Sequence, residues 1–234
     1  MTKIRSVFRD FVRHVVNGEV DEVSRLLAAT PTLATAKAEV GAARDGAADF
    51  FFIEIAHYLY AGDTALHMAA AAFRRPMAML LVANGADCQA KNRRGAQPLH
   101  YAADANHWEP ARQAETIEYL LSIGADPDAL DKSGVAPLHR AVRTRSLPAV
   151  RALLDGGANL RLANRSGSTP LHLAVQTTGR GGSGSEHARL QQTGIIRILM
   201  ERGAGPTDKD GRGKQVLQSV TSAWIRDLLI GGSV

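Results

Sequence analysis

The stretch Thr169-Pro-Leu-His172-Leu-Ala174 decides the fold of this chain, because three closely related stretches precede it. They are Thr64-Ala-Leu-His67-Met-Ala69, Gln97-Pro-Leu-His100-Tyr-Ala102 and Ala136-Pro-Leu-His139-Arg-Ala141. A Thr followed by a Pro is typical of a helix start, since the Thr hydroxyl caps the first turn and the Pro needs no amide hydrogen bond there. Later in each repeat, an aliphatic pair precedes a Gly-Ala pair suited to end a second helix, at Gly85, Gly124, Gly157 and Gly203. The pattern predicts helix pairs that repeat about every 33 residues.

The spacing of the motifs shows which part of the repeat is constant. Each of the first three glycines stands at the same interval before the next motif histidine, as in Gly85 to His100, Gly124 to His139 and Gly157 to His172. The interval from a histidine to the Gly of its own repeat varies instead, and it is longer in the second and fourth repeats than in the first and third. Two repeats therefore carry insertions between their helices, within residues 106–115 and 179–187. A solenoid tolerates such additions because they leave its stacking surface unchanged.

These motifs resemble those of the ankyrin repeat family, most specifically between Tyr60 and Asp210. The resemblance implies an all-α solenoid of about six helix pairs joined by β-hairpin turns, with insertions in three places. It also implies a protein that binds other proteins and is not an enzyme, and a role in inter-repeat hydrogen bonds for the motif histidines. Gln97 and Ala136 depart from the family pattern by replacing the capping Thr, and Ala65 replaces the Pro. Loss of the cap at Ala136 is expected to cost about 1 kcal/mol.

We expect residues 1–234 to form one ankyrin-repeat domain. Residues 1–35 are expected to be an N-terminal capping helix pair, and residues 36–60 an inserted aromatic segment. The predicted repeats are 61–92, 93–131, 132–164 and 165–210, and a degenerate C-terminal capping repeat covers 211–234. In this last repeat, Gln215-Val-Leu-Gln218 stands at the motif position without the histidine.

The composition limits the class of protein. The chain has 45% hydrophobic residues, enough for a substantial core, and no secretory signal. No apolar run approaches the length of about 18 residues that a membrane-spanning helix needs. Its single cysteine, Cys88, excludes an intrachain disulfide framework and favours a reducing compartment. We therefore predict a soluble, cytoplasmic protein, and a monomer because a capped solenoid needs no second copy. The net charge of +5 is too small to predict nucleic-acid binding by itself.

Ankyrin-like arrays bind partners through their hairpin tips and the exposed side of each first helix, which together line a concave groove. This register gives the candidate partner-binding residues Tyr60, Asp63, Arg93, Arg94, Asp104, Lys132, Arg143, Arg165, Arg212 and Lys214. Because seven of them are cations, we expect a basic groove that binds an acidic protein segment, with Arg making bidentate carboxylate contacts. The alternative is an accessory nucleic-acid or anionic-surface binder that uses the same basic face. For any single Arg, a solvated surface charge is the simplest interpretation.

The inserted segment before the first motif is the most aromatic part of the chain. Its periodicity fits both a helix and a strand, so its conformation stays open. Two roles also stay open, because the segment either packs over the start of the stack or supplies an aromatic anchor for a partner. Trp108, in the next insertion, is likewise either a hydrophobic plug or a contact residue.

No motif in the chain predicts catalysis or cofactor binding. Gly179-x-Gly181-x-x-Gly184 matches the letters of a dinucleotide-binding loop, but it follows a helix rather than a strand. The motif histidines lie in layers about 10 Å apart, too far to share a zinc ion. The other four, His14, His57, His107 and His187, have no evident partner ligands. We therefore expect no catalytic residue, metal, cofactor or small-molecule substrate.

Overall fold

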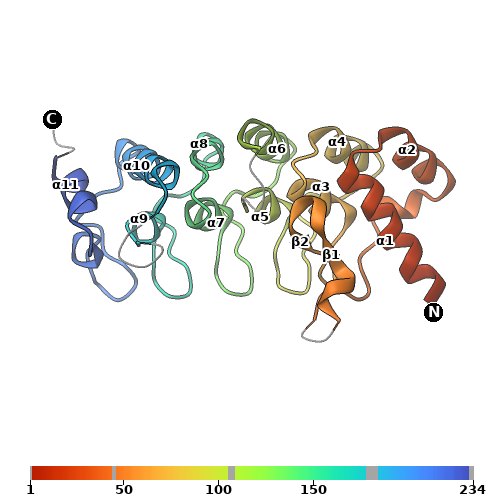
Figure 1. The fold of residues 1–234 in the computed structure, drawn as a ribbon, viewed down its shortest axis with the longest axis horizontal. Coiled ribbons are helices and arrows are strands. Elements are labelled where there is room, and N and C mark those ends of the chain that lie inside the picture. Colours follow the sequence, from red (N-terminus) through yellow and green to blue (C-terminus); the bar gives the residue numbers. More distant parts are fainter. Residues whose placement is uncertain (1, 44–45, 105–108, 178–183, 232–234) are drawn as a thin grey trace.

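The fold is a row of helix pairs in a computed structural model, which describes residues 2–43, 46–104, 109–177 and 184–231, with side chains from residue 7 onward (Figure 1). In the repeats, each first helix lies next to the hairpins and each second helix lies on the outer side of the row. The pairs are α1 (Thr2–Asn17) with α2 (Val20–Ala29), α3 (Ala65–Ala71) with α4 (Arg75–Ala83), α5 (Pro98–Ala102) with α6 (Pro110–Ser122), α7 (Pro137–Arg143) with α8 (Leu147–Asp155), and α9 (Pro170–Ala174) with α10 (Glu186–Glu201). A short turn, η1 (Pro31–Ala34), follows α2, and α11 (Ala223–Gly231) ends the described row.

The first helices begin where the motif predicts. The Thr64 hydroxyl accepts a hydrogen bond from the main-chain amide of His67, and Thr169 serves the last motif in the same way. Ala136 has no side-chain cap, but its amide donates to Nδ1 of the His139 ring at 3.0 Å. The motif histidine therefore helps to close the first turn even where the capping Thr is absent.

The motif histidines also join each repeat to the next. Because Nδ1 accepts a hydrogen bond at its own helix start, the Nε2–H group is the donor to the following repeat. The acceptors are the carbonyls of Ala96 for His67 (3.0 Å), Val135 for His100 (3.0 Å), Leu162 for His139 (2.9 Å) and Lys214 for His172 (3.1 Å). Burial lowers the pKa of His67 and of His100 to about 4, so both rings are neutral at pH 7. The inter-repeat role implied by the resemblance is confirmed.

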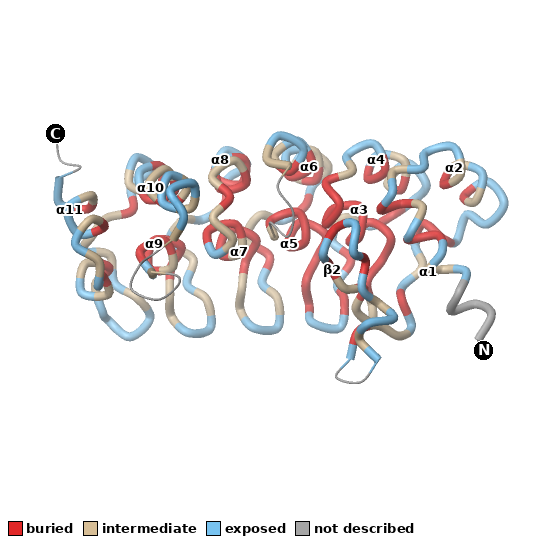
Figure 2. The backbone as a smooth tube through the Cα atoms, in the orientation of Figure 1, coloured by how far each residue is buried: buried red, intermediate tan, exposed pale blue. Residues whose placement is uncertain are grey.

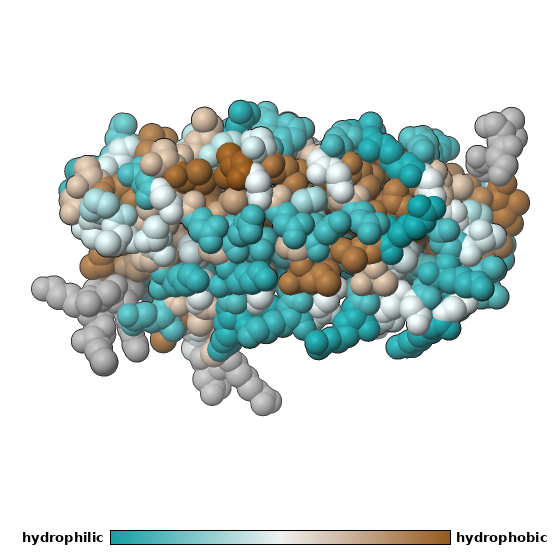
Figure 3. Space-filling model, turned by 180° about the vertical axis from the view of Figure 1, so that it is seen from behind, coloured by the Kyte–Doolittle hydropathy of each residue, from teal (hydrophilic) through white to brown (hydrophobic). Residues whose placement is uncertain are grey.

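The core lies between the two helix layers and continues into the hairpin bases (Figure 2). All seven residues of α3 are buried, and four of them are alanines, which let neighbouring helices approach closely. At the N-terminal end, α1 covers the stack with Phe11, Val12 and Val15. Seen from behind, a hydrophilic band runs along the middle of the row, and hydrophobic residues gather above it over the outer helices (Figure 3).

The hairpin tips stack on one another through main-chain hydrogen bonds. The Arg93 amide donates to the Ala61 carbonyl at 3.0 Å, and the Lys132 amide donates to the Arg94 carbonyl at 2.9 Å. At Gly134, where φ is +67°, an added Cβ would lie 2.9 Å from the amide nitrogen of the next hairpin. Glycine is required there by both its φ and this close approach. The tips therefore form a continuous strip that holds their side chains in a row.

The described chain is largely helical, and its named strands lie in the inserted segment, whose conformation the sequence leaves open. This segment contains two short turns, η2 (Ala47–Phe50) and η3 (Ile53–Ile55), and two short strands, β1 (Phe51–Phe52) and β2 (His57–Tyr58). The strands pair antiparallel, Phe51 with Tyr58 and Phe52 with His57, and Ala56 closes the turn with a φ of 47°. Its buried apolar residues, Phe52, Ile55 and Leu59, lie three and four positions apart, which is a helical spacing, and the segment nevertheless folds as a small ribbon.

The last unit also differs from a regular repeat. A single turn, η5 (Leu217–Ser219), stands where a first helix would lie. Lys209 and Gln215 still pair across the preceding hairpin, and Val216 and Ile225 are buried against the stack. The last unit thus has a hairpin and an outer helix without the full motif.

Candidate functional site: the inner face of the first repeats

We call the inner face the surface formed by the first helices α3, α5 and α7, the adjoining hairpin tips and the ribbon β1–β2. Its N-terminal end is built around the carboxylate of Asp63, which is 0% exposed. The Tyr101 hydroxyl lies 2.8 and 2.9 Å from the two carboxylate oxygens, the Asn92 side-chain amide donates at 2.8 Å, and the Tyr60 main-chain amide donates at 2.6 Å. Burial raises the pKa of Asp63 to about 6, and these donors limit the rise. The cluster ties the first hairpin to the second hairpin and to α5.

The ribbon covers this cluster. The His57 ring is buried, and its centroid lies 4.6 Å from that of Tyr101; burial lowers the pKa of His57. Tyr60 follows the ribbon, and the guanidinium carbon of Arg94 lies 4.1 Å from the centroid of the Tyr60 ring. A pocket of about 360 Å³ opens between these groups, with Tyr58 and Asn92 also in its wall. One side of this pocket is aromatic, and the other carries guanidinium groups.

Arg140 separates this pocket from a second one of about 380 Å³. Its Nη1 donates to Asp104 at 2.7 Å, and its Nη2 donates to Asp131 at 3.0 Å. Burial alone would lower the pKa of Arg140, but the two carboxylates more than offset this effect and raise it. Burial likewise acts to raise the pKa of Asp131, but main-chain hydrogen bonds and Arg140 lower it on balance. Asp131 is therefore held as a carboxylate, and the single cation Arg140 is shared between Asp104 and Asp131.

The structure divides the predicted partner-binding residues into three groups. Asp63 is buried within its cluster, so the expectation that it faces a partner is corrected: the ribbon and Tyr101 enclose it. Four residues line the two pockets, namely Tyr60, Arg94, Asp104 and Arg143. The remaining five are exposed at hairpin tips and line neither pocket: Arg93, Lys132, Arg165, Arg212 and Lys214.

Comparison with known proteins agrees with this architecture. A family model for ankyrin repeats in three copies matches residues 40–129 and 109–210, which together cover more than half of the chain. The chain belongs to the ankyrin repeat family. It is also similar to the ankyrin repeat protein FPV022 of fowlpox virus (strain NVSL), with 38% identity over 52 residues. Those residues are 22% of this chain and 8% of the viral protein, so the chain matches only a small part of that protein's length.

Ankyrin repeats are in general protein-interaction modules, and members of the family are typically non-enzymatic scaffolds. Two inner-face residues of this ankyrin repeat protein, Tyr101 and Arg140, were missed by the sequence-based prediction. Each of them directly follows the motif histidine of its repeat. The residue at the same place is Met68 in the first repeat and Leu173 in the fourth. The change from apolar to polar residues at this one place of the motif is the signal that could have identified them.

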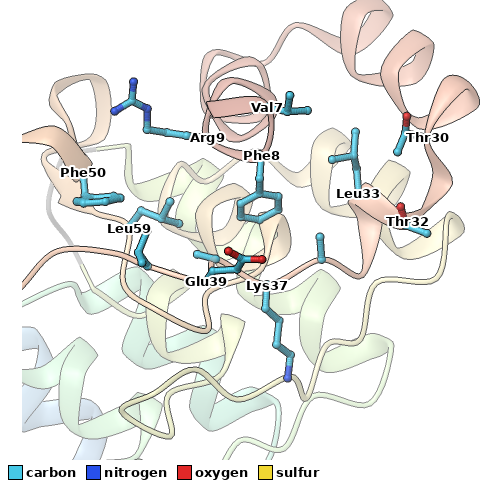
Figure 4. A pocket seen from close by; sticks show the side chains of 13 residues that line it. Val7, Phe8, Arg9, Thr30, Thr32, Leu33, Lys37, Glu39, Phe50 and Leu59 are labelled. Atoms are coloured by element: carbon cyan, nitrogen blue, oxygen red, sulfur yellow. The ribbon is translucent and has the colours of Figure 1, made fainter. Parts of the chain in front are cut away.

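A separate cavity of about 610 Å³ lies between α1, η1 and the inserted segment. Phe8 projects from α1 between Leu33 on one side and Leu59 and Phe50 on the other (Figure 4). The Nη1 atom of Arg9 donates to the Asp49 carbonyl at 3.1 Å and links α1 to the insertion. The walls of this cavity are mainly apolar, in contrast to the charged pockets of the inner face.

The described part of the chain contains no group of three His, Cys, Asp or Glu side chains placed to hold a metal ion. Within the same residues, no helix has the length and apolar character needed to cross a membrane. Trp108, His107 and most of the glycine motif at 179–184 lie outside the described residues.

Proposed function

We propose that this chain is a non-enzymatic protein-interaction module, which binds an acidic segment of another protein through the inner face and the hairpin tips. The observation that carries the proposal is the imbalance between available cations and available acids. Seven of the predicted partner-binding residues are exposed cations that, within the described ranges, make no ion pair with an acid: Arg93, Arg94, Lys132, Arg143, Arg165, Arg212 and Lys214. On the same surface, Asp63 is buried, and Asp104 and Asp131 share Arg140.

The succession of these cations along the row of hairpin tips favours an extended ligand. Main-chain hydrogen bonds join the tip at Arg93 and Arg94 to the tips before and after it, so neighbouring cations keep a fixed spacing along the row. An acidic segment that crosses successive tips would meet Arg94, then Lys132, then Arg165. Arg side chains favour carboxylates because their planar N–H groups bind both oxygens. Charge of one sign along the surface would also speed association at low salt.

Charge reversal tests this proposal. We expect a fluorescein-labelled (Glu-Ser)6 peptide to bind the wild-type chain and to bind at least about tenfold more weakly after four tip cations are changed to Glu, as expected when close charge pairs are lost. The four are Arg93, Arg94, Lys132 and Arg165. The matched control reverses four exposed cations of the outer helices and brings the same change in net charge: Arg75, Arg151, Arg197 and Arg226. Equal loss in both variants, or no loss in either, would refute a site at the tips.

The same assay also tests nucleic-acid binding, which is the alternative function. A fluorescein-labelled single-stranded oligonucleotide, with as many nucleotides as the peptide has residues, is expected to bind more weakly than the peptide at physiological salt. Binding of the strand that exceeds peptide binding, and that falls steeply and log-linearly with salt, would replace the protein ligand with a phosphate backbone.

A further inference from the structure

The ribbon leaves apolar surface exposed beside the charged pocket. Its inner side buries Phe52, Ile55 and Leu59, while Phe51 is 39% exposed and Ile53 at its turn is 79% exposed. Exposure of large apolar side chains to water is energetically unfavourable, and patches of such side chains are typical of surfaces where proteins bind other proteins. The repeat stack does not require them, because they belong to the insertion.

This apolar surface is continuous with Arg94. The ring centroids of Phe51 and Tyr58 are 4.8 Å apart, those of Tyr58 and Tyr60 are 6.2 Å apart, and the Arg94 guanidinium carbon lies 4.1 Å from the Tyr60 centroid. The four groups therefore form a row with an apolar end and a cationic end. The distance from the Phe51 ring to the Arg94 guanidinium is at most the sum of these steps, which an extended peptide spans with about five residues at about 3.3 Å each.

The Arg94 guanidinium is held in place, but its hydrogen-bond donors are not used by the described residues. It stacks on Tyr60, and within the part of the chain that the structure describes its N–H groups make no hydrogen bond or ion pair. This cation–π contact restrains the guanidinium, and its N–H groups remain available to bind a carboxylate. Arg140, on the far side of the same pocket, is already bound to Asp104 and Asp131.

We infer that the ribbon and Arg94 together form a composite subsite, which binds a partner segment with a bulky apolar residue two or four positions from a carboxylate. Even spacing is required because side chains of an extended segment point to the same face at every second residue. The apolar residue packs on Phe51 and Ile53, and the carboxylate binds Arg94. This inference rests on the proposed function and specifies which acidic segments the protein selects.

Selection from a random peptide display library tests the inference without knowledge of the natural partner. The full chain is expected to enrich peptides with an apolar residue and an acid two or four positions apart. Ile53→Ser is expected to remove the apolar preference and keep the acidic one, whereas Arg94→Gln is expected to remove the paired motif. The controls are Met79→Ser on α4 and Arg151→Gln on α8, both at exposed positions. They are expected to leave the profile unchanged.

Two synthetic peptides then measure the coupling, one with Leu and one with Ala placed two positions before a Glu. We expect the Leu peptide to bind the wild-type chain about tenfold more tightly, which corresponds to about 1.4 kcal/mol. With Ile53→Ser, the two peptides are expected to bind equally. Acidic enrichment without a Leu preference would overturn the composite subsite and leave the proposed function intact. Failure to enrich acidic peptides would overturn both.

Discussion

Replacement of Asp63 by Asn tests the most unusual feature of the inner face, a buried carboxyl group in a hairpin. Two physical effects oppose each other at this site. Burial disfavours the charged form, whereas the hydroxyl of Tyr101, the side-chain amide of Asn92 and the main-chain amide of Tyr60 all donate toward it. Burial is the larger effect, so the pKa of Asp63 rises from 3.8 to about 6.

The rise in pKa sets both the sign and the size of the expected effect on stability. Between about pH 4 and about pH 6 the folded protein holds a proton on Asp63 that the unfolded chain has lost. The contribution of Asp63 to the free energy of unfolding is therefore full below about pH 4 and is lost as the pH rises through about 6. A shift of about two units corresponds to about 3 kcal/mol. The introduced asparagine side chain does not titrate, so the variant lacks this dependence.

The assay is urea unfolding, followed by circular dichroism, of the wild type and Asp63→Asn at steps from about pH 3.5 to about pH 7. The free energy of unfolding of the wild type minus that of the variant is expected to fall by about 3 kcal/mol over this range. Titration of His67 and His100 affects both proteins and cancels in the difference. The control is Asp227→Asn, an exposed acid on α11, whose difference is expected to stay within about 0.5 kcal/mol. A flat difference for Asp63 would show that the donors balance burial, and a difference that rises with pH would show that they outweigh it.

The remaining predictions concern the repeat scaffold. Arg145→Gly is expected to raise the free energy of unfolding by about 1 kcal/mol, because Arg145 has a positive φ of 57°; a loss of stability in urea would show that its side-chain contacts outweigh this strain. Gly134→Ala is expected to lower the melting temperature more than Gly213→Ala does, since both glycines have positive φ but only at Gly134 would a Cβ approach the Arg165 amide, at 2.9 Å. Equal losses would remove the steric argument. Burial holds the pKa of His100 at about 4, so its contribution to stability is present above pH 6.5 and is lost as the pH falls through 4. NMR titration of the ring is expected to show an inflection below about pH 5, and one near the ordinary value of 6.5 would contradict the buried, neutral ring.

The repeat scaffold could be predicted from the sequence because its determinants are local. A cap, a first-turn Pro and a left-handed Gly each act within a few residues, and the constant interval from each Gly to the next motif histidine fixed the register of the hairpins. The family resemblance implied the hydrogen bonds from the motif histidines to the next repeat, and the structure shows which atoms form them. The helix at Ala136 begins at the predicted residue although the side-chain cap is absent, and His139 accepts a hydrogen bond from the Ala136 amide there.

The candidate site was less predictable because its geometry depends on contacts between distant residues. The His57 ring packs at a tilt against Tyr101, which lies more than a full repeat later in the chain, and no local sequence pattern predicts that contact. The conformation of the inserted segment is determined by the same contacts, so its own periodicity was ambiguous. Arg140 was missed because it belongs to the helix motif, whereas the predicted partner-binding positions are the hairpin tips and the ends of the first helices.

Burial of Asp63 changes what the first repeat offers to a partner. Its place in the hairpin corresponds to that of Ala96 and Val135 in the next two repeats, directly before the motif. In the first repeat, the insertion lies over this place and encloses the acid, so the exposed surface there comes from the ribbon, with Phe51 and Ile53 outermost. The row of repeats therefore has two chemically different ends, an apolar one supplied by the insertion and a cationic one supplied by the later tips. A segment that carries acidic residues alone would use only the second, and this difference is what the Leu and Ala peptides measure.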